Sequence, residues 1–195
     1  AIRLYTKTLA NRPKTNAHSH ELLRQQLQTA DNTAAMLDQF SEYSAIEQGM
    51  LASHPEAVNL RALLDRVAAA LQATHPRTRL RLAVHGRLDA SWVWLDRSQI
   101  MRIVQNLAGN AVRYSAGVPA RGPARVVLAV RPHGRDLVLD VVDNGRGIPE
   151  DKLGLVFEPY VQLAAGSGTR EAEAARAGCG LGLAIVRGLV AQLGL

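Results

Sequence analysis

The sequence predicts an α+β protein in which a two-layer α/β sandwich with a mixed sheet follows a partial antiparallel helical hairpin. The first observation is a polar stretch from Ala17 to Gln48 without glycine or proline, which favours one long helix. The second is that helices and strands after residue 53 do not alternate strictly, which disfavours a doubly wound parallel sheet. A chain of 195 residues with 47% hydrophobic residues is long enough for one domain and an appended segment. We therefore expect the hairpin at residues 1–52 and the sandwich at residues 53–195.

The predicted hairpin consists of a short helix at residues 1–10, a turn at residues 11–16, and a long helix at residues 17–48. Apolar residues recur along the long helix at spacings of four and three, as in a coiled-coil seam; they are Leu23, Leu27, Ala30, Ala34 and Leu37. Because one helix cannot bury such a seam alone, we expect the hairpin to pair with a second copy in a four-helix bundle. The alternative is one long helix of an ordinary α domain. The mismatch in helix length favours the hairpin, with a first helix that begins before residue 1.

Caps and apolar periodicity define the helices of the sandwich. Asn59 is a candidate N-cap for a helix with one apolar face, made of Leu60, Leu63, Leu64, Val67 and Leu71. Asp96 and Gln99 form a candidate capping box for a second helix. Its apolar face carries Ile100, Ile103, Val104, Leu107 and Ala111. A third helix is expected from Gly182 to the end of the chain, with four buried residues, Leu183, Val186, Leu189 and Val190.

Apolar runs predict the strands of the sandwich, at residues 80–84, 92–95, 125–130 and 137–142. The last two strands are expected to form a hairpin that is joined through residues 131–136. Residues 161–177 are rich in Gly, Ala, Ser and Glu, and this composition predicts a flexible loop.

Composition and charge exclude several classes of protein. No run of about 18 apolar residues occurs, so no membrane-spanning helix is expected, and no signal segment opens the chain. Cys179 is the single cysteine, which excludes an internal disulfide framework and fits a reducing compartment. The net charge of +6 comes from arginines spread along the chain, so no nucleic acid partner is expected. The sequence also lacks a P-loop and a glycine-rich dinucleotide turn.

Four short motifs nevertheless follow one another in the second half of the chain, at residues 106–114, 143–147, 157–160 and 178–183. The first motif places Asn106 and Asn110 on one helical face. Because Mg²⁺ takes oxygen ligands and keeps several waters, the Asn110 carboxamide is a candidate metal ligand. Arg113 is a candidate phosphate contact, and Tyr114 adds a flat ring. The alternative is that both asparagines are ordinary residues of a helix surface.

The second motif begins with a carboxylate at the end of an apolar strand. Asp143 would be partly buried there and would need a hydrogen-bond donor, for which the exocyclic amine of adenine is suitable. Gly145 and Gly147 lack side chains, which lets a flat base approach the backbone and permits positive φ. The alternative is a simple Asp-Asn-Gly turn without a ligand.

The fourth motif alternates Gly178, Gly180 and Gly182 before the last predicted helix. Backbone N–H groups there, together with the helix N-terminus, would form an anion cradle for a triphosphate. The alternative is a flexible hinge at the start of the helix. In the first case the preceding loop would cover the nucleotide, with Arg170 and Arg176 near the phosphates.

In this order, the motifs resemble the N, G1, F and G2 boxes of the catalytic, ATP-binding domain of bacterial sensor histidine kinases. This domain belongs to the wider superfamily of the gyrase, Hsp90 and MutL ATPases. The resemblance covers most of residues 55–195 and implies ATP and Mg²⁺ as cofactors, with Asn110 as the metal ligand. The implied cofactor-binding residues are Asn106, Asn110, Arg113, Tyr114, Asp143, Gly145, Gly147, Ile148, Gly178, Gly180, Leu181, Gly182 and Leu183.

The resemblance also extends to the predicted hairpin. Residues 40–49 are similar to the end of the second helix of the family's dimerisation and phosphoacceptor hairpin, and residues 1–10 to its first helix just after the histidine-containing H box. The acceptor histidine is therefore expected before residue 1. His20 begins a segment that resembles an H box with one residue inserted, but no proline follows and the second helix ends too soon afterwards. We expect His18 and His20 to face solvent, and the family's closing strand pair to be missing after the last helix.

The activity implied by the resemblance is that of a protein-histidine kinase. The γ-phosphate of Mg²⁺·ATP would pass to a histidine and then to an aspartate of a response-regulator receiver domain. The resemblance further implies a homodimer through the hairpin. It also implies that this part lies in the cytoplasm without membrane contact, even if the full-length protein is anchored in the inner membrane. A non-catalytic ATP-binding regulator, or degenerate kinase, and a dimerisation scaffold with a vestigial pocket are the alternatives. Cys179 is expected to be incidental.

Overall fold

The computed structural model of the chain describes residues 17–84, 92–115, 122–134, 136–163 and 179–195. The helix expected at residues 1–10 and the turn at residues 11–16 lie outside these ranges. Most of the loop expected at residues 161–177 lies outside them as well.

The described strands form two sheets, of which the larger is mixed as predicted. In the larger sheet the order is β2 (Arg79–Val84), β4 (Arg125–His133) and β5 (Asp136–Asp143). Strand β2 runs parallel to β4, and β5 runs antiparallel to β4. A smaller antiparallel sheet pairs β1 (Glu56–Asn59) with β3 (Trp92–Leu95). Strand β1 was not predicted, because its four residues gain a strand partner only from a segment far along the chain.

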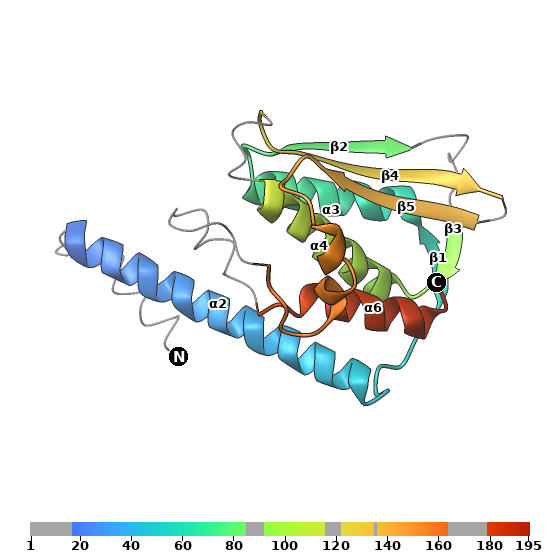
Figure 1. Cartoon of the computed structure of the whole chain (residues 1–195), viewed down its shortest axis with the longest axis horizontal. Coiled ribbons are helices and arrows are strands. Elements are labelled where there is room, and N and C mark those ends of the chain that lie inside the picture. The colour runs from blue at the N-terminus through green and yellow to red at the C-terminus, as the bar shows by residue number, and fades with distance from the viewer. Residues whose placement is uncertain (1–16, 85–91, 116–121, 135, 164–178) are drawn as a thin grey trace.

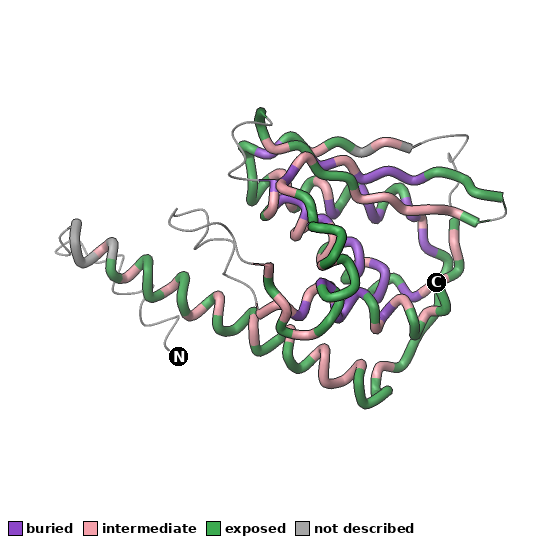
Figure 2. Tube along the Cα trace, in the orientation of Figure 1, coloured by how far each residue is buried: buried purple, intermediate pink, exposed green. Residues whose placement is uncertain are grey.

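Three helices form the second layer of the sandwich, α3 (Leu60–Thr74), α4 (Arg97–Ser115) and α6 (Gly182–Leu193). They lie on one side of the larger sheet, as Figure 1 shows. The buried residues concentrate between these helices and β4 (Figure 2), and include Leu63, Leu64, Val104, Val126, Leu128, Ile185 and Leu189. Two 3-10 turns, η2 (Glu150–Lys152) and η3 (Leu155–Phe157), follow β5. The α+β fold class with a two-layer arrangement is therefore confirmed.

Helix α2 (Ala17–Glu47) confirms the predicted long helix and lies outside the sandwich, beside α6 (Figure 1). None of its described side chains is fully buried, and Leu37 of the predicted seam is 62% exposed. Its C-terminal part packs closely on α6, because a Cβ atom on Gly188 would lie only 2.5 Å from Cγ2 of Ile46. An ion pair at 2.6 Å joins Glu42 of α2 to Arg102 of α4. Among the described residues, no helix has the length and apolar character that crossing a membrane requires.

The predicted helix caps are largely confirmed. The side-chain oxygen of Asn59 accepts a hydrogen bond of 2.9 Å from the backbone N–H of Ala62. One carboxylate oxygen of Asp96 accepts from the backbone N–H groups of Ser98 and Gln99, at 2.8 and 3.0 Å. The second half of the capping box is not formed: the Gln99 amide donates to the carbonyl of Ala52 at 3.4 Å, and its oxygen accepts no hydrogen bond within the described residues.

The β4–β5 hairpin is tighter than predicted. We expected residues 131–136 to form the connection, but most of them belong to the strands. The register pairs Arg131 with Val138 and His133 with Asp136, so the turn is only two residues long. Its first residue, Gly134, has a φ of +64°, as such a turn requires.

Two glycines allow segments that are distant in sequence to pack directly on α4. Gly145, in the turn after β5, is buried, and a Cβ atom there would lie 2.8 Å from the carbonyl carbon of Tyr114. Gly182, at the start of α6, would place a Cβ atom 3.0 Å from Oδ1 of Asn106. The turn after β5 and the start of α6 therefore both pack directly on α4.

We predict that Asp96→Ala lowers the free energy of unfolding by about 2 to 4 kcal/mol. The carboxylate is only 4% exposed and also accepts a hydrogen bond of 2.7 Å from the backbone N–H of His54. Removing it exposes the first turn of α4 and leaves the N–H of His54 without an acceptor. Urea denaturation measures the loss, and an Asp96→Ala variant as stable as the wild type would contradict the role of this cap.

The ionisation of Asp96 makes stability depend on pH. Burial opposes its charge, but hydrogen bonds from His54, Ser98 and Gln99 outweigh this and hold the pKa at about 2, below the ordinary 3.8. Because folding lowers the pKa, the stabilisation is complete above the unfolded value and is lost as the pH falls through the folded value. Relative to Asp96→Asn, the wild type should lose about 1 to 2 kcal/mol of unfolding free energy between roughly pH 5 and pH 2. If the unfolding free energies of the two proteins changed in parallel with pH, Asp96 would not be the source of this pH dependence.

We also predict opposite effects for two glycine substitutions. Gly145→Ala should lower the free energy of unfolding by about 1 to 3 kcal/mol, because the new methyl group collides with the backbone of Tyr114. Gly109→Ala is the matched control inside α4, where a Cβ atom meets nothing within 4 Å. This control should raise stability by about 0.5 to 1 kcal/mol, the usual preference of a helix interior for alanine. If denaturation showed both variants shifting in the same direction, the close packing at Gly145 would not be the cause.

Candidate nucleotide-binding site

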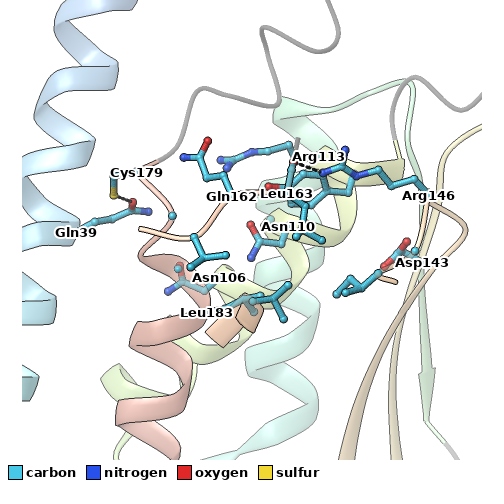
Figure 3. Close-up of a pocket in the computed structure, with 18 of the residues that line it drawn as sticks. Gln39, Asn106, Asn110, Arg113, Asp143, Arg146, Gln162, Leu163, Cys179 and Leu183 are labelled. Atoms are coloured by element: carbon cyan, nitrogen blue, oxygen red, sulfur yellow. Dashed lines mark hydrogen bonds between the residues drawn. The ribbon is translucent and has the colours of Figure 1, made fainter. Parts of the chain in front are cut away.

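One pocket brings most of the predicted site residues together (Figure 3). It lies among α4, the turn after β5 and the start of α6, and one residue of α2 reaches it. The predicted residues that line it are Asn106, Asn110, Arg113, Tyr114, Asp143, Gly147, Ile148, Gly180, Gly182 and Leu183. Gly178 lies outside the described residues, as do Arg170 and Arg176.

Helix α4 supplies the polar wall of the pocket. Asn106 and Asn110 lie on its pocket face, one turn apart, and Arg113 continues that face (Figure 3). Tyr114 also lines the pocket. The Asn106 amide donates a hydrogen bond of 3.0 Å to the carbonyl of Arg102, which fixes the orientation of the side chain. Its oxygen is therefore turned toward Gly182 at the start of α6.

The last residue of β5, Asp143, contributes a carboxylate to the pocket. Asp143 was expected to be partly buried, but it is exposed, because β5 ends where the pocket opens. Its Oδ1 accepts a hydrogen bond of 2.7 Å from the backbone N–H of Gly145. Gly147 lines the pocket with a φ of +76°, which explains the glycine by its conformation. Gly145 is not among the lining residues, and its missing side chain admits the backbone of Tyr114. The approach of a base to this turn stays a prediction.

The start of α6 provides an anion-binding geometry. The helix begins after Leu181, which provides no side-chain hydrogen bond to cap it, and its first turn carries no acidic residue. The first N–H groups of this 12-residue helix thus remain available to a negatively charged ligand. Leu183 was expected to be buried but is partly exposed and lines the pocket, whereas Leu181 is 1% exposed and belongs to the core.

The third motif, at residues 157–160, supports the pocket from outside. The backbone N–H of Tyr160 donates a hydrogen bond of 3.0 Å to the carbonyl of Gly180. Both residues have left-handed backbones, with φ of +65° and +73°. Glu158 accepts a hydrogen bond of 2.6 Å from Arg187 of α6, and this bond lowers the pKa of Glu158. The motif therefore fixes the backbone that enters α6.

Several lining residues were missed by the sequence analysis. Gln105 and Gly109 share the pocket side of α4 with Asn106, so helical spacing alone would have found them. Arg146 lies within the second motif and was passed over between two glycines. Three residues of the expected loop, Val161, Gln162 and Leu163, are described and also line the pocket.

Helix α2 also contributes to the pocket. Gln39 lines it, and the thiol of Cys179 donates a hydrogen bond of 2.9 Å to the Gln39 side-chain oxygen (Figure 3). No sequence signal places a residue from α2 beside the fourth motif, because the contact joins segments 140 positions apart. Cys179, which was expected to be incidental, therefore joins α2 to the pocket.

The donor set of the pocket suits a metal that is shared with a ligand. No group of three or more His, Cys, Asp or Glu side chains converges anywhere in the described part of the chain. The carboxamide oxygen of Asn110 is a neutral, hard donor of the type that Mg²⁺ uses together with phosphate oxygens and water.

Comparisons with known proteins show which family the chain resembles. Residues 95–195 match the family described as "Histidine kinase-, DNA gyrase B-, and HSP90-like ATPase". The nitrogen regulation protein NtrY of Azorhizobium caulinodans is 28% identical over 161 residues, which cover 82% of this chain and 18% of NtrY. The autoinducer 2 sensor kinase/phosphatase LuxQ of Vibrio cholerae is 30% identical over 188 residues, which cover 95% of this chain and 21% of LuxQ. The chain thus spans about a fifth of the length of these relatives.

Two solved structures share the fold of this chain. Full-length ShkA in complex with AMPPNP matches with a TM-score of 0.76 at 22% identity, over 99% of this chain and 38% of ShkA. The histidine kinase AdeS of Acinetobacter baumannii matches with a TM-score of 0.61 at 21% identity, over 97% of this chain and 80% of the other. The family match covers just over half of the chain and includes all four motifs. The chain therefore belongs to the histidine kinase-, DNA gyrase B- and HSP90-like ATPases.

Proposed function

We propose that this chain binds Mg²⁺·ATP in the pocket of Figure 3 and donates the γ-phosphate to a histidine on a dimerisation hairpin. The phosphoryl group would then pass to an aspartate of a response-regulator receiver domain. The observation that carries the proposal is the convergence of α4, the turn after β5 and the uncapped start of α6 on one pocket. Family membership and the AMPPNP bound to ShkA support an adenine nucleotide as the ligand.

The two ends of the pocket suggest how ATP is oriented. Asp143 would accept a hydrogen bond from the exocyclic amine of adenine, beside Gly147, Ile148 and the ring of Tyr114. The triphosphate would lie at the other end, against Arg113 and the first N–H groups of α6. Backbone groups of the fourth motif would complete that end; they belong to Gly178, Gly180, Leu181, Gly182 and Leu183.

Asn110, with Asn106 beside it, would hold the Mg²⁺ ion on the phosphate side. The ion supplies charge neutralisation to the transferring phosphoryl group when it is bound. The residues of the chain bind and orient the nucleotide, so that the γ-phosphate faces the attacking imidazole. In this class of reaction, catalysis consists mostly of such positioning and of electrostatic stabilisation.

Residues 1–52 would belong to the dimerisation hairpin, and residues 53–195 to the catalytic domain. Leu37 of the predicted seam is exposed on α2, as are Leu22 and Phe40. These exposed apolar side chains support a homodimer, because a helix with an apolar seam requires a partner helix. The acceptor histidine would lie upstream of Ala1, so that the donor and acceptor sites are on different segments. This part of the protein would then lie in the cytoplasm, where ATP and receiver domains are found.

We predict that Asn110→Ala abolishes the magnesium-dependent part of ATP binding. Isothermal titration should show at least about tenfold weaker binding of Mg²⁺·ATP, equivalent to about 1.4 kcal/mol. With EDTA present, wild type and variant should bind ATP equally. Gln26→Ala, which removes an exposed carboxamide from α2, should bind Mg²⁺·ATP like the wild type. Wild-type affinity of the Asn110→Ala variant for Mg²⁺·ATP would sink the assignment of the metal ligand.

Phosphotransfer separates the kinase from the two alternatives. A longer chain of the same natural protein, which includes the segment upstream of Ala1, should become labelled by γ-labelled ATP on a histidine. A non-catalytic regulator would bind ATP without transferring label, and a dimerisation scaffold would not bind ATP. Labelling that is lost with His20→Gln would instead identify His20 as the acceptor and would contradict the proposed upstream position.

A further inference from the structure

We propose that Arg146 is a positioning residue that builds the base-side wall of the nucleotide pocket and is not a ligand of the phosphates. The inference rests on the proposed function and deepens it. Nothing in the four-motif pattern assigns a role to this arginine, which stands between Gly145 and Gly147. A cationic side chain that lines a triphosphate pocket would ordinarily be taken for a phosphate contact.

The guanidinium of Arg146 is held by two other segments of the pocket. Its Cζ lies over the ring of Tyr114, 4.9 Å from the ring centroid. One of its nitrogens, Nη2, donates a hydrogen bond of 3.0 Å to the carbonyl of Leu163 (Figure 3). A planar guanidinium can stack on an aromatic ring and donate in its own plane at the same time, whereas a lysine ammonium has no plane that can stack. Arg146 thus joins the end of α4 to the segment at residues 161–163.

The backbone next to Arg146 is held by contacts of Gly145 with Tyr114 and Asp143. Gly145 packs against the backbone of Tyr114, the same residue whose ring lies under the guanidinium. The N–H of Gly145 is also bonded to Asp143, at 2.7 Å. The carboxylate proposed to bind adenine, the ring of Tyr114 and Arg146 therefore form one connected unit. This unit lies at the base end, whereas Arg113 and the start of α6 serve the phosphate end.

The two roles predict different binding profiles. We would measure the affinity of ATP, ADP and AMP by displacement of a fluorescent ATP analogue from wild type, Arg146→Lys and Arg146→Gln. A wall-building role predicts that both variants bind all three nucleotides roughly tenfold more weakly, a loss equal to about 1.4 kcal/mol. If Arg146 were a phosphate ligand, Arg146→Lys would keep most of the affinity. Arg146→Gln would then weaken the binding of ATP most and the binding of AMP least. That second profile would overturn the inference.

A double-mutant cycle tests whether Arg146 acts through the aromatic ring. In a Tyr114→Leu background, Arg146→Lys should weaken nucleotide binding by less than about twofold, because the stacking partner is already gone. An unchanged tenfold loss in that background would show a general structural defect and would overturn the inference. Arg61→Lys, at an exposed arginine of α3 paired with Asp65, serves as the matched control and should bind like the wild type.

The proposed function and this inference fail in distinguishable ways. A wild-type chain that binds none of the three nucleotides would overturn the proposed function, and the role of Arg146 with it. A wild-type chain that binds ATP, together with an Arg146→Lys variant of equal affinity, would overturn the role of Arg146 alone.

Discussion

The pocket depends on how closely two glycine backbones approach helix α4. Gly145 lets the turn after β5 press against the backbone of Tyr114, and Gly182 lets the start of α6 lie against the side chain of Asn106. A methyl group at either position would meet heavy atoms at 3.0 Å or less. Without these approaches, Asp143 and the first N–H groups of α6 would not face one cavity, and the four motifs would remain separate features of the sequence.

Helix α4 links binding to stability because its two faces serve different purposes. Ile103, Val104 and Ala108 are buried in the core, while Asn106, Asn110 and Arg113 line the pocket. A change that shifts the core face therefore moves the pocket face of the same rigid helix. The cap at Asp96 fixes the first turn of this helix. The buried carboxylate therefore also helps to position Asn106 and Asn110, although it lies outside the pocket.

Sequence reasoning predicted the elements that depend on local signals. The caps at Asn59 and Asp96 and the apolar faces of α3 and α4 follow from short-range chemistry. The features it missed depend on long-range contacts: β1 becomes a strand only beside β3, and Gln39 reaches the pocket only because α2 packs on α6. The close contact of Gly145 with the backbone of Tyr114 is another long-range feature that the sequence did not predict.

In the proposed orientation, the base lies beside the turn after β5 and the triphosphate lies at the start of α6. Backbone amide resonances measured by NMR during titration with Mg²⁺·ATP and with adenosine distinguish the two ends. We expect Gly145 and Gly147 to shift with both ligands, whereas Gly180 and Gly182 shift with Mg²⁺·ATP alone. Equal shifts of all four glycines with both ligands, or shifts confined to residues outside the pocket, would contradict this orientation.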